Sequence, residues 1–224
     1  MSRRTYNQYC ATARTLDVVG ERWTLLIVRD LLTGPKRFSD LLAGLPGIGT
    51  GLLAGRLKFL QDEGLIVPVI LPPPARVAGY ALTEAGEELR PAVMALASWG
   101  LRWAMAERRA DEDFQPGWAV LGMQALFNPD AARDLRLVYE FRVGDEVFHA
   151  RVDHGAIDSV HGPAQRPDVT IETSPAVFVE LAAGRMKLAD AVRDGTATAS
   201  GDRQAIRKLR SLFHPQQPKD RAVT

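Results

Sequence analysis

Hydrophobic residues recur every three to four positions through most of the first 110 residues, which is the period of a helix with one buried face. Gly34-Pro35 and Pro46-Gly47 interrupt this pattern, and glycine and proline commonly end helices. Gly64 stands where a left-handed residue would close a further helix. The pattern therefore predicts helices over residues 14–19, 22–32, 38–43 and 50–63.

After the fourth predicted helix the pattern changes to that of strands. Residues 65–71 and 77–82 are rich in β-branched and apolar side chains, and a proline run ending in Ala75-Arg76 separates them. We expect a hairpin with a stiff tip, then a helix that Thr83 caps and Pro91 kinks or restarts. Three helices followed by a hairpin form the winged helix-turn-helix arrangement.

The second half follows a different pattern, in which short strands alternate with short helices. The charged run over 107–113 is the predicted domain boundary. Gly144-Asp145 predicts a hairpin turn, and Ser174 and Asp202 are predicted helix caps. The expected strands are 135–143, 146–152, 157–161, 169–173 and 196–200, and the expected helices are 118–127, 175–183, 188–193, one from Pro129 and one after Asp202.

The predicted fold class is therefore α+β, with two domains of different construction. A winged helix-turn-helix domain is expected over residues 1–110, and a small curved sheet covered by helices over 115–214. Residues 215–224 are expected to form a flexible tail.

Composition narrows the class of protein. The chain has 224 residues, of which 46% are hydrophobic and 25% charged, as in globular domains. It contains no uncharged run of the roughly 18 residues that a membrane span needs, and no apolar segment near its start that would serve as a secretory signal. The single cysteine, Cys10, fits a reducing compartment. We expect a cytoplasmic protein that does not bind membranes.

Charge is distributed unevenly along the chain. Residues 1–110 hold 14 lysines and arginines against 10 acidic residues, whereas 111–224 hold 14 against 17. A basic first half and an acidic second half indicate domains with different partners, although an ordinary solvated surface would also give so small an excess.

A winged-helix domain reads double-stranded DNA by placing the second helix of its helix-turn-helix in the major groove. In this chain the candidate reading helix is residues 50–63, whose outer face carries small residues that would permit close approach to DNA. Basic residues before the preceding helix and on the wing suit phosphate groups. Taken singly, each is more often plain solvated surface. The expected DNA contacts are Lys36, Arg37, Thr50, Gly51, Arg56, Lys58 and Arg76.

Four segments of the first half resemble the HxlR family of bacterial winged-helix transcriptional regulators. They run over 10–42, 45–57, 73–83 and 97–100, within a match of about residues 8–105. The resemblance implies a homodimer that pairs through its first helix and the long helix after the wing. It also implies a pseudo-palindromic operator, and it favours repression.

The same resemblance implies roles for particular residues. It places reading-helix contacts at Thr50, Gly51 and Arg56, and aligns Cys10 with a cysteine that some relatives use to sense oxidants. Those relatives usually have proline at the next position, where this chain has Ala11. Cys10 is therefore either a redox sensor or a passive thiol.

The second half carries no recognisable catalytic set or metal motif. Its three neighbouring histidines, His149, His154 and His161, fit no familiar zinc spacing. We therefore expect no enzyme activity, no metal and no cofactor. Its aromatic residues form either a solid core or the wall of a ligand pocket. The candidate ligand-binding residues are Trp118, Phe127, Tyr139, Phe141, Phe148 and Phe178.

This half resembles the sterol carrier protein 2 (SCP2) fold more loosely, over about residues 115–214. The matching parts are the strand pair in 137–152, the segment 166–174, Ala183-Gly184, and 194–202 with the last helix. That family encloses a hydrophobic tunnel, so the resemblance implies a site for a small apolar effector.

The sequence thus predicts a DNA-binding transcriptional regulator that responds to an apolar effector. Two alternatives stay open. One is a regulator switched through Cys10, with a purely structural second domain. The other is a lipid carrier or enzyme that uses its winged helix only to dimerise.

Overall fold

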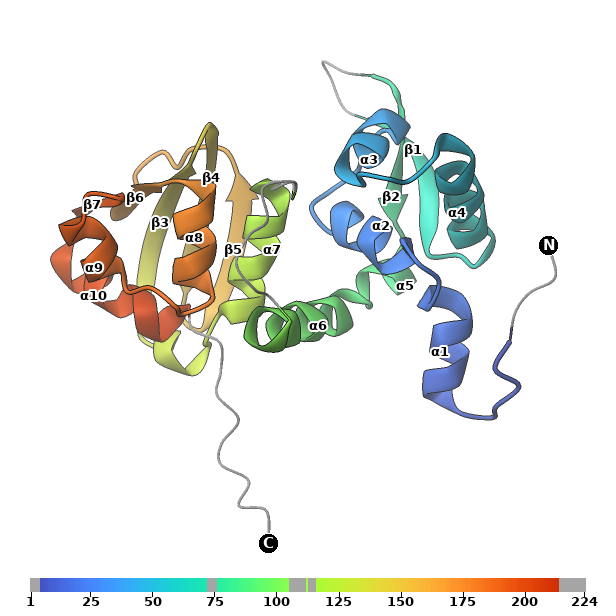
Figure 1. The fold of residues 1–224 in the computed structure, drawn as a ribbon, viewed down its shortest axis with the longest axis horizontal. Coiled ribbons are helices and arrows are strands. Elements are labelled where there is room, and N and C mark those ends of the chain that lie inside the picture. Colours follow the sequence, from blue (N-terminus) through green and yellow to red (C-terminus); the bar gives the residue numbers. More distant parts are fainter. Residues whose placement is uncertain (1–4, 72–75, 105–111, 113–115, 214–224) are drawn as a thin grey trace, which may run out of the picture. The chain divides into compact units, whose positions relative to one another are not determined.

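The computed structural model describes residues 5–71, 76–104, 112 and 116–213. Most of the predicted boundary segment 107–113 and the whole predicted tail 215–224 lie outside these residues. The chain divides into two compact units, residues 1–93 and 94–224, so the division falls inside a helix (Figure 1). We describe each unit by itself.

The first unit is the expected array of helices with a two-stranded sheet. Its core contains apolar residues of α2, α3 and α4, together with the first residue of β1. The elements are α1 (Ala11–Val19), α2 (Thr24–Leu31), α3 (Phe38–Gly44), α4 (Thr50–Asp62), β1 (Ile66–Ile70), β2 (Ala78–Leu82), α5 (Glu84–Glu87) and α6 (Arg90–Trp103), the last of which continues into the second unit.

Two helix starts differ from the sequence expectation. Helix α1 begins three residues early, after Cys10, which has the extended backbone of an N-cap residue. Helix α2 begins two residues late, because Trp23 adopts a left-handed conformation with φ of 77°. The Arg22 guanidinium lies 4.9 Å from the centroid of the Trp23 ring, within cation–π range. The turn before α2 thus ends at Trp23, in a left-handed backbone conformation that tryptophan seldom adopts.

The predicted break at Pro91 is confirmed. Helix α5 ends at Glu87 and α6 begins at Arg90. Thr83 caps α5 as expected, since its hydroxyl accepts a hydrogen bond from the Gly86 amide at 3.1 Å and donates one to the Gly64 carbonyl at 2.7 Å.

The hairpin carries a short third partner that the pattern did not predict. Strands β1 and β2 pair antiparallel, and Lys36 bridges to Tyr80 on β2 through backbone hydrogen bonds of 3.0 and 2.8 Å. Gly79 is required beside this bridge, because an added Cβ would lie 2.7 Å from the Lys36 carbonyl oxygen. The backbone before α3 is thereby fixed to the wing.

The second unit contains a five-stranded sheet in the order β5-β4-β3-β6-β7. Neighbouring strands are antiparallel except for the parallel pair β3 and β6. The strands match the expected ranges to within one residue at each end. They are β3 (Arg136–Val143), β4 (Glu146–Asp153), β5 (Ala156–His161), β6 (Val169–Thr173) and β7 (Ala197–Gly201), and the helices are α7 (Pro116–Leu126), the 3-10 turn η1 (Asp130–Ala132), α8 (Pro175–Ala182), α9 (Leu188–Arg193) and α10 (Arg203–Leu212).

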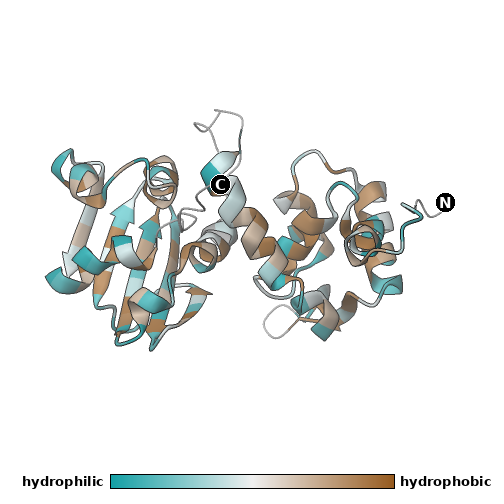
Figure 2. Cartoon of the chain, turned by 90° about the horizontal axis from the view of Figure 1, so that it is seen from below, coloured by the Kyte–Doolittle hydropathy of each residue, from teal (hydrophilic) through white to brown (hydrophobic). Residues whose placement is uncertain are grey.

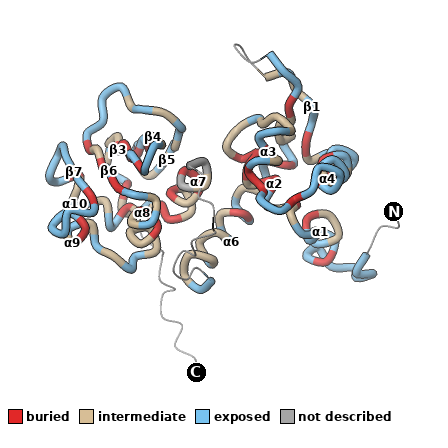
Figure 3. Tube along the Cα trace, turned by 45° about the horizontal axis from the view of Figure 1, so that its top comes forward, coloured by how far each residue is buried: buried red, intermediate tan, exposed pale blue. Residues whose placement is uncertain are grey.

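Alternate residues of the central strands face the helices and form this unit's core. Phe141 and Phe148 stack with centroids 5.4 Å apart, and Phe178 of α8 meets Phe148 edge-on at 5.6 Å. Helix α7 packs on β4 and β5, whereas α9 and α10 pack on β7. Figure 2 shows apolar and polar residues alternating along the strands, and Figure 3 shows buried residues on the strands and on the helices beside them.

Candidate DNA-binding surface and ligand cavity

Helix α4 separates a buried face from an open one. Leu53, Leu57 and Leu60 are buried against the first unit's core. On the outer face Thr50 and Gly51 are exposed. A Cβ added at Gly51 or at the neighbouring exposed Gly55 would meet no other atom within 4 Å. The outer face therefore leaves space for a close partner, as a helix in the major groove requires.

The basic residues of α4 are both engaged within the domain. Arg56 forms an ion pair of 2.9 Å with Glu21, and its side chain is only 21% exposed. Its Nε atom is buried without a hydrogen-bond partner. Lys58 is largely exposed and pairs with Asp62 at 3.1 Å, one turn along the helix. Lys58 is therefore readily accessible to a phosphate, whereas Arg56 would first have to leave Glu21.

The remaining expected DNA contacts lie before α3 and on the wing. Lys36 is half-buried and held through its backbone by Tyr80. Arg37 occupies the N-cap of α3, and its amide donates to the Asp40 carboxylate at 3.1 Å. Arg76 is exposed and left-handed, with φ of 40°. All seven expected contacts thus lie in the first unit, on α4, at the start of α3 and on the wing.

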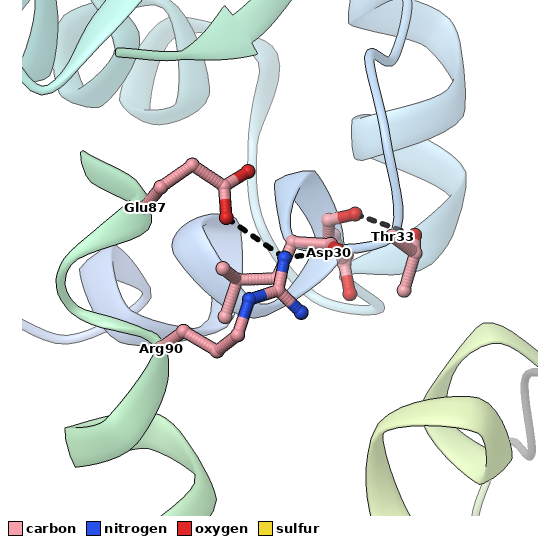
Figure 4. Close-up of polar contacts among 5 residues, drawn as sticks. Asp30, Thr33, Glu87 and Arg90 are labelled. Carbon is pink, nitrogen blue, oxygen red and sulfur yellow. Dashed lines mark hydrogen bonds and ion pairs between the residues drawn. The ribbon is translucent and has the colours of Figure 1, made fainter. Parts of the chain in front are cut away.

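A cluster that the sequence did not single out fixes the start of α6. Arg90 donates to the Glu87 carboxylate at 2.8 Å and to the Leu32 carbonyl at the end of α2 at 3.2 Å (Figure 4). Beside it, Thr33 donates to the Asp30 carbonyl at 2.7 Å. The first turn of α6 is therefore attached to the C-terminal end of α2.

Helix α6 carries an apolar stripe that the described chain leaves open. Leu96, Trp99 and Trp103 are 54%, 59% and 67% exposed. Their spacing of three and four residues places them on one side of the helix. Large apolar side chains that share an exposed face commonly mark an interaction surface.

Cys10 is exposed and free at the start of α1. The nearby backbone amides of Ala13 and Thr12 favour the thiolate and hold the pKa of the Cys10 thiol below its ordinary value. A lowered pKa increases the fraction of reactive thiolate at neutral pH.

The second unit contains a cavity of about 690 Å³. Of the six aromatic residues expected to bind a ligand, Phe141 and Phe178 line it. The other four, Trp118, Phe127, Tyr139 and Phe148, are not among its lining residues.

Three of these four residues belong to the solid part of the core. Phe127, Tyr139 and Phe148 are buried, and the Tyr139 hydroxyl donates to the Ala205 carbonyl at 2.9 Å. The alternative of a solid core, which the sequence left open, therefore describes these three residues better. Most lining residues that sequence reasoning missed lie on α8, α9, α10 and the connection after α8. The helical spacing of the apolar residues in the last helix was the sequence signal that could have indicated part of this lining.

Each of the three neighbouring histidines of the second unit lies beside an oxygen atom of another residue. His149 is buried with Nδ1 2.9 Å from the Gly162 carbonyl oxygen, and His154 and His161 lie beside Asp153 and Glu146. Within the part of the chain that the structure describes, no group of histidine, cysteine and acidic residues could hold a metal ion. Nor does any helix in the described ranges have the length and apolarity to cross a membrane.

Comparison with known proteins identifies the first half. The model of the HxlR-like helix-turn-helix family matches residues 18–108. The Bacillus subtilis HTH-type transcriptional regulator YvaP is 36% identical over 91 residues, which are 40% of this chain and 83% of that protein. The chain belongs to the HxlR-like helix-turn-helix family.

Two other regulators are also similar to part of the chain. An HTH-type transcriptional regulator of Mycobacterium tuberculosis is 41% identical over 90 residues, covering 40% of this chain and 56% of that protein. The solved structure of the reduced form of YodB from B. subtilis is 30% identical and covers 43% of this chain and 96% of that one, with a TM-score of 0.37.

The second half matches a different family model, described as alkyl sulfatase C-terminal, over residues 123–224. The chain therefore combines an HxlR-like domain with a distinct C-terminal domain of mixed helices and strands. The finer resemblance to SCP2 stays a prediction.

Proposed function

We propose that this protein is a homodimeric transcriptional repressor that binds a pseudo-palindromic operator and responds to a small apolar effector, and that it is not an enzyme. The observation that carries the proposal is the open outer face of α4, on a chain whose relatives are named as HTH-type transcriptional regulators. Thr50, Gly51 and Lys58 would approach the bases and phosphates, with Lys36, Arg37 and Arg76 at the flanks. Arg56 would join them by exchanging Glu21 for phosphate.

A charge placed on the outer face of α4 tests this assignment. Ala54 is exposed there, so Ala54→Glu adds a negative charge that DNA would repel without filling the core. Gln61→Glu is the matched control, because it adds the same charge at an exposed site near the end of the same helix. On a duplex enriched by the wild-type chain from a random pool, we expect Ala54→Glu to abolish binding and Gln61→Glu to retain it. Equal effects would contradict this use of α4.

The apolar stripe of α6 supports the proposed dimer. Burying Leu96, Trp99 and Trp103 against a second copy would remove large apolar surfaces from water. Light scattering with size-exclusion chromatography should report a dimer for the wild type and a monomer for Trp99→Glu. A wild-type monomer at micromolar concentration would contradict the proposal.

The cavity supports the effector, since its 690 Å³ lies within the roughly 300–1,000 Å³ of small-molecule sites. Effector binding would change operator affinity by the roughly 1–3 kcal/mol typical of coupled sites. A saturating effector that leaves operator affinity unchanged would contradict this coupling and leave DNA binding intact.

The exposure and lowered pKa of Cys10 favour a second candidate, a redox-responsive regulator with a structural C-terminal domain. Under that candidate, diamide would reduce operator binding by the wild type and leave Cys10→Ser unaffected.

A further inference from the structure

The cavity of the second unit combines an apolar interior with basic residues around it. Its lining includes Phe141 and Ile171 from the sheet and Phe178 from α8. It also includes Lys187, Arg207 and Arg210, all of which are exposed. A ligand that fills this site would therefore meet apolar surfaces and cationic groups together.

Helix α10 supplies both kinds of surface from adjacent positions. Ile206 and Leu209 are partly buried and pack against the core of the unit. Arg207 and Arg210 each follow one of them, which places the two guanidinium groups one turn apart beside the apolar stripe. The long side chains of arginine extend along apolar surfaces while their charged ends stay in water.

The charges around the cavity do not cancel one another. Arg185 is held by Glu180 through hydrogen bonds of 2.7 and 2.8 Å, and Asp190 pairs with Arg193 at 2.9 Å. Lys187, Arg207 and Arg210 form no ion pair with any residue in the described ranges. This local excess is opposite in sign to the acidic balance of residues 111–224.

We propose that the cavity binds a single-chain anionic amphiphile, with its apolar chain inside and its carboxylate or similar head group held by Arg207, Arg210 and Lys187. This inference rests on the proposed effector function and adds to it the charge of the ligand. Guanidinium groups bind such anions through paired, charge-assisted hydrogen bonds. A volume of 690 Å³ suits a ligand of drug size.

The test is isothermal titration calorimetry of the full chain with decanoate, decanol and decyltrimethylammonium, each below its micelle-forming concentration. The three probes share an apolar chain and differ in head-group charge. We expect decanoate to bind about tenfold more tightly than decanol, as contacts with two or three exposed cations would give. The cationic probe should bind most weakly.

Two variants of α10 show whether these residues cause the preference. Arg207→Gln/Arg210→Gln removes two cavity-lining charges and should bring decanoate to the affinity of decanol. Arg203→Gln/Lys208→Gln removes the same charge from exposed positions outside the lining and should keep the tenfold preference.

The outcomes separate this inference from the proposed function. Equal binding of the three probes, a preference for the cationic probe, or equal loss in both variants would overturn the anionic assignment while an apolar effector remained. Failure of all three probes to bind would overturn the apolar effector site itself.

Discussion

The ion pair between Arg56 and Glu21 leads to the prediction that removing one of its partners, Glu21, strengthens DNA binding. In the free chain the two side chains lie 2.9 Å apart, and they are 21% and 43% exposed. Glu21→Gln removes the partner that holds Arg56 and a negative charge beside α4. If Arg56 exchanges Glu21 for phosphate on binding, this loss of an acidic residue should strengthen binding to DNA.

The size of the effect follows from the exposure of the pair. Ion pairs at partly exposed sites contribute roughly 0.2–1 kcal/mol, so releasing Arg56 should raise affinity by at most about fivefold. Arg56→Gln should lower affinity and reduce the slope of log K against log salt by about 0.9, the value for one phosphate contact. Both constants can be measured by fluorescence anisotropy over a salt series.

Glu88→Gln is the control, because it removes the same charge from an exposed residue of the same unit. It should change affinity less than Glu21→Gln does. Weaker DNA binding by Glu21→Gln, with an unchanged salt slope in Arg56→Gln, would show that Arg56 does not exchange Glu21 for a phosphate. The pair would then serve to hold α4 in place.

Three other predictions concern stability and reactivity. Gly86→Ala should lower the free energy of unfolding by about 1–3 kcal/mol in urea, because an added Cβ would overlap the Leu65 carbonyl oxygen and the Leu82 side chain. Gly55→Ala, in open space, should be neutral or stabilising. Burial raises the pKa of Tyr139 above its ordinary value near 10, so stability should fall as the pH rises above 10, and less so in Tyr139→Phe. Iodoacetamide should modify Cys10 with a midpoint pH below that of an unstructured peptide, and an equal midpoint would contradict the effect of the nearby backbone amides.

The fold could be predicted from local signals wherever those signals act within a few residues. Thr83, Ser174 and Asp202 cap helices as expected, because a side-chain oxygen near free backbone amides acts locally. The left-handed Trp23 and the bridge from Lys36 to Tyr80 had no such signal. The bridge joins residues far apart in the sequence, and Trp23 packs against the core of the first unit.

The candidate sites were predictable to different degrees. The exposed face of α4 follows from helical periodicity, since burying Leu53, Leu57 and Leu60 determines which side stays open. The lining of the cavity cannot be predicted from periodicity in this way. Whether a buried aromatic such as Phe148 lines a space or fills one depends on how α8, α9 and α10 pack.

Sequence-specific DNA binding can be tested by selecting duplexes from a random pool with the purified full chain. A sequence-specific dimer should enrich a pseudo-palindrome whose half-sites lie about one helical turn, roughly 34 Å, apart. The enriched duplex should bind more tightly than a scrambled one across the salt series. Equal, weak binding of enriched and scrambled duplexes would contradict the proposal that this HxlR-family chain is a sequence-specific regulator.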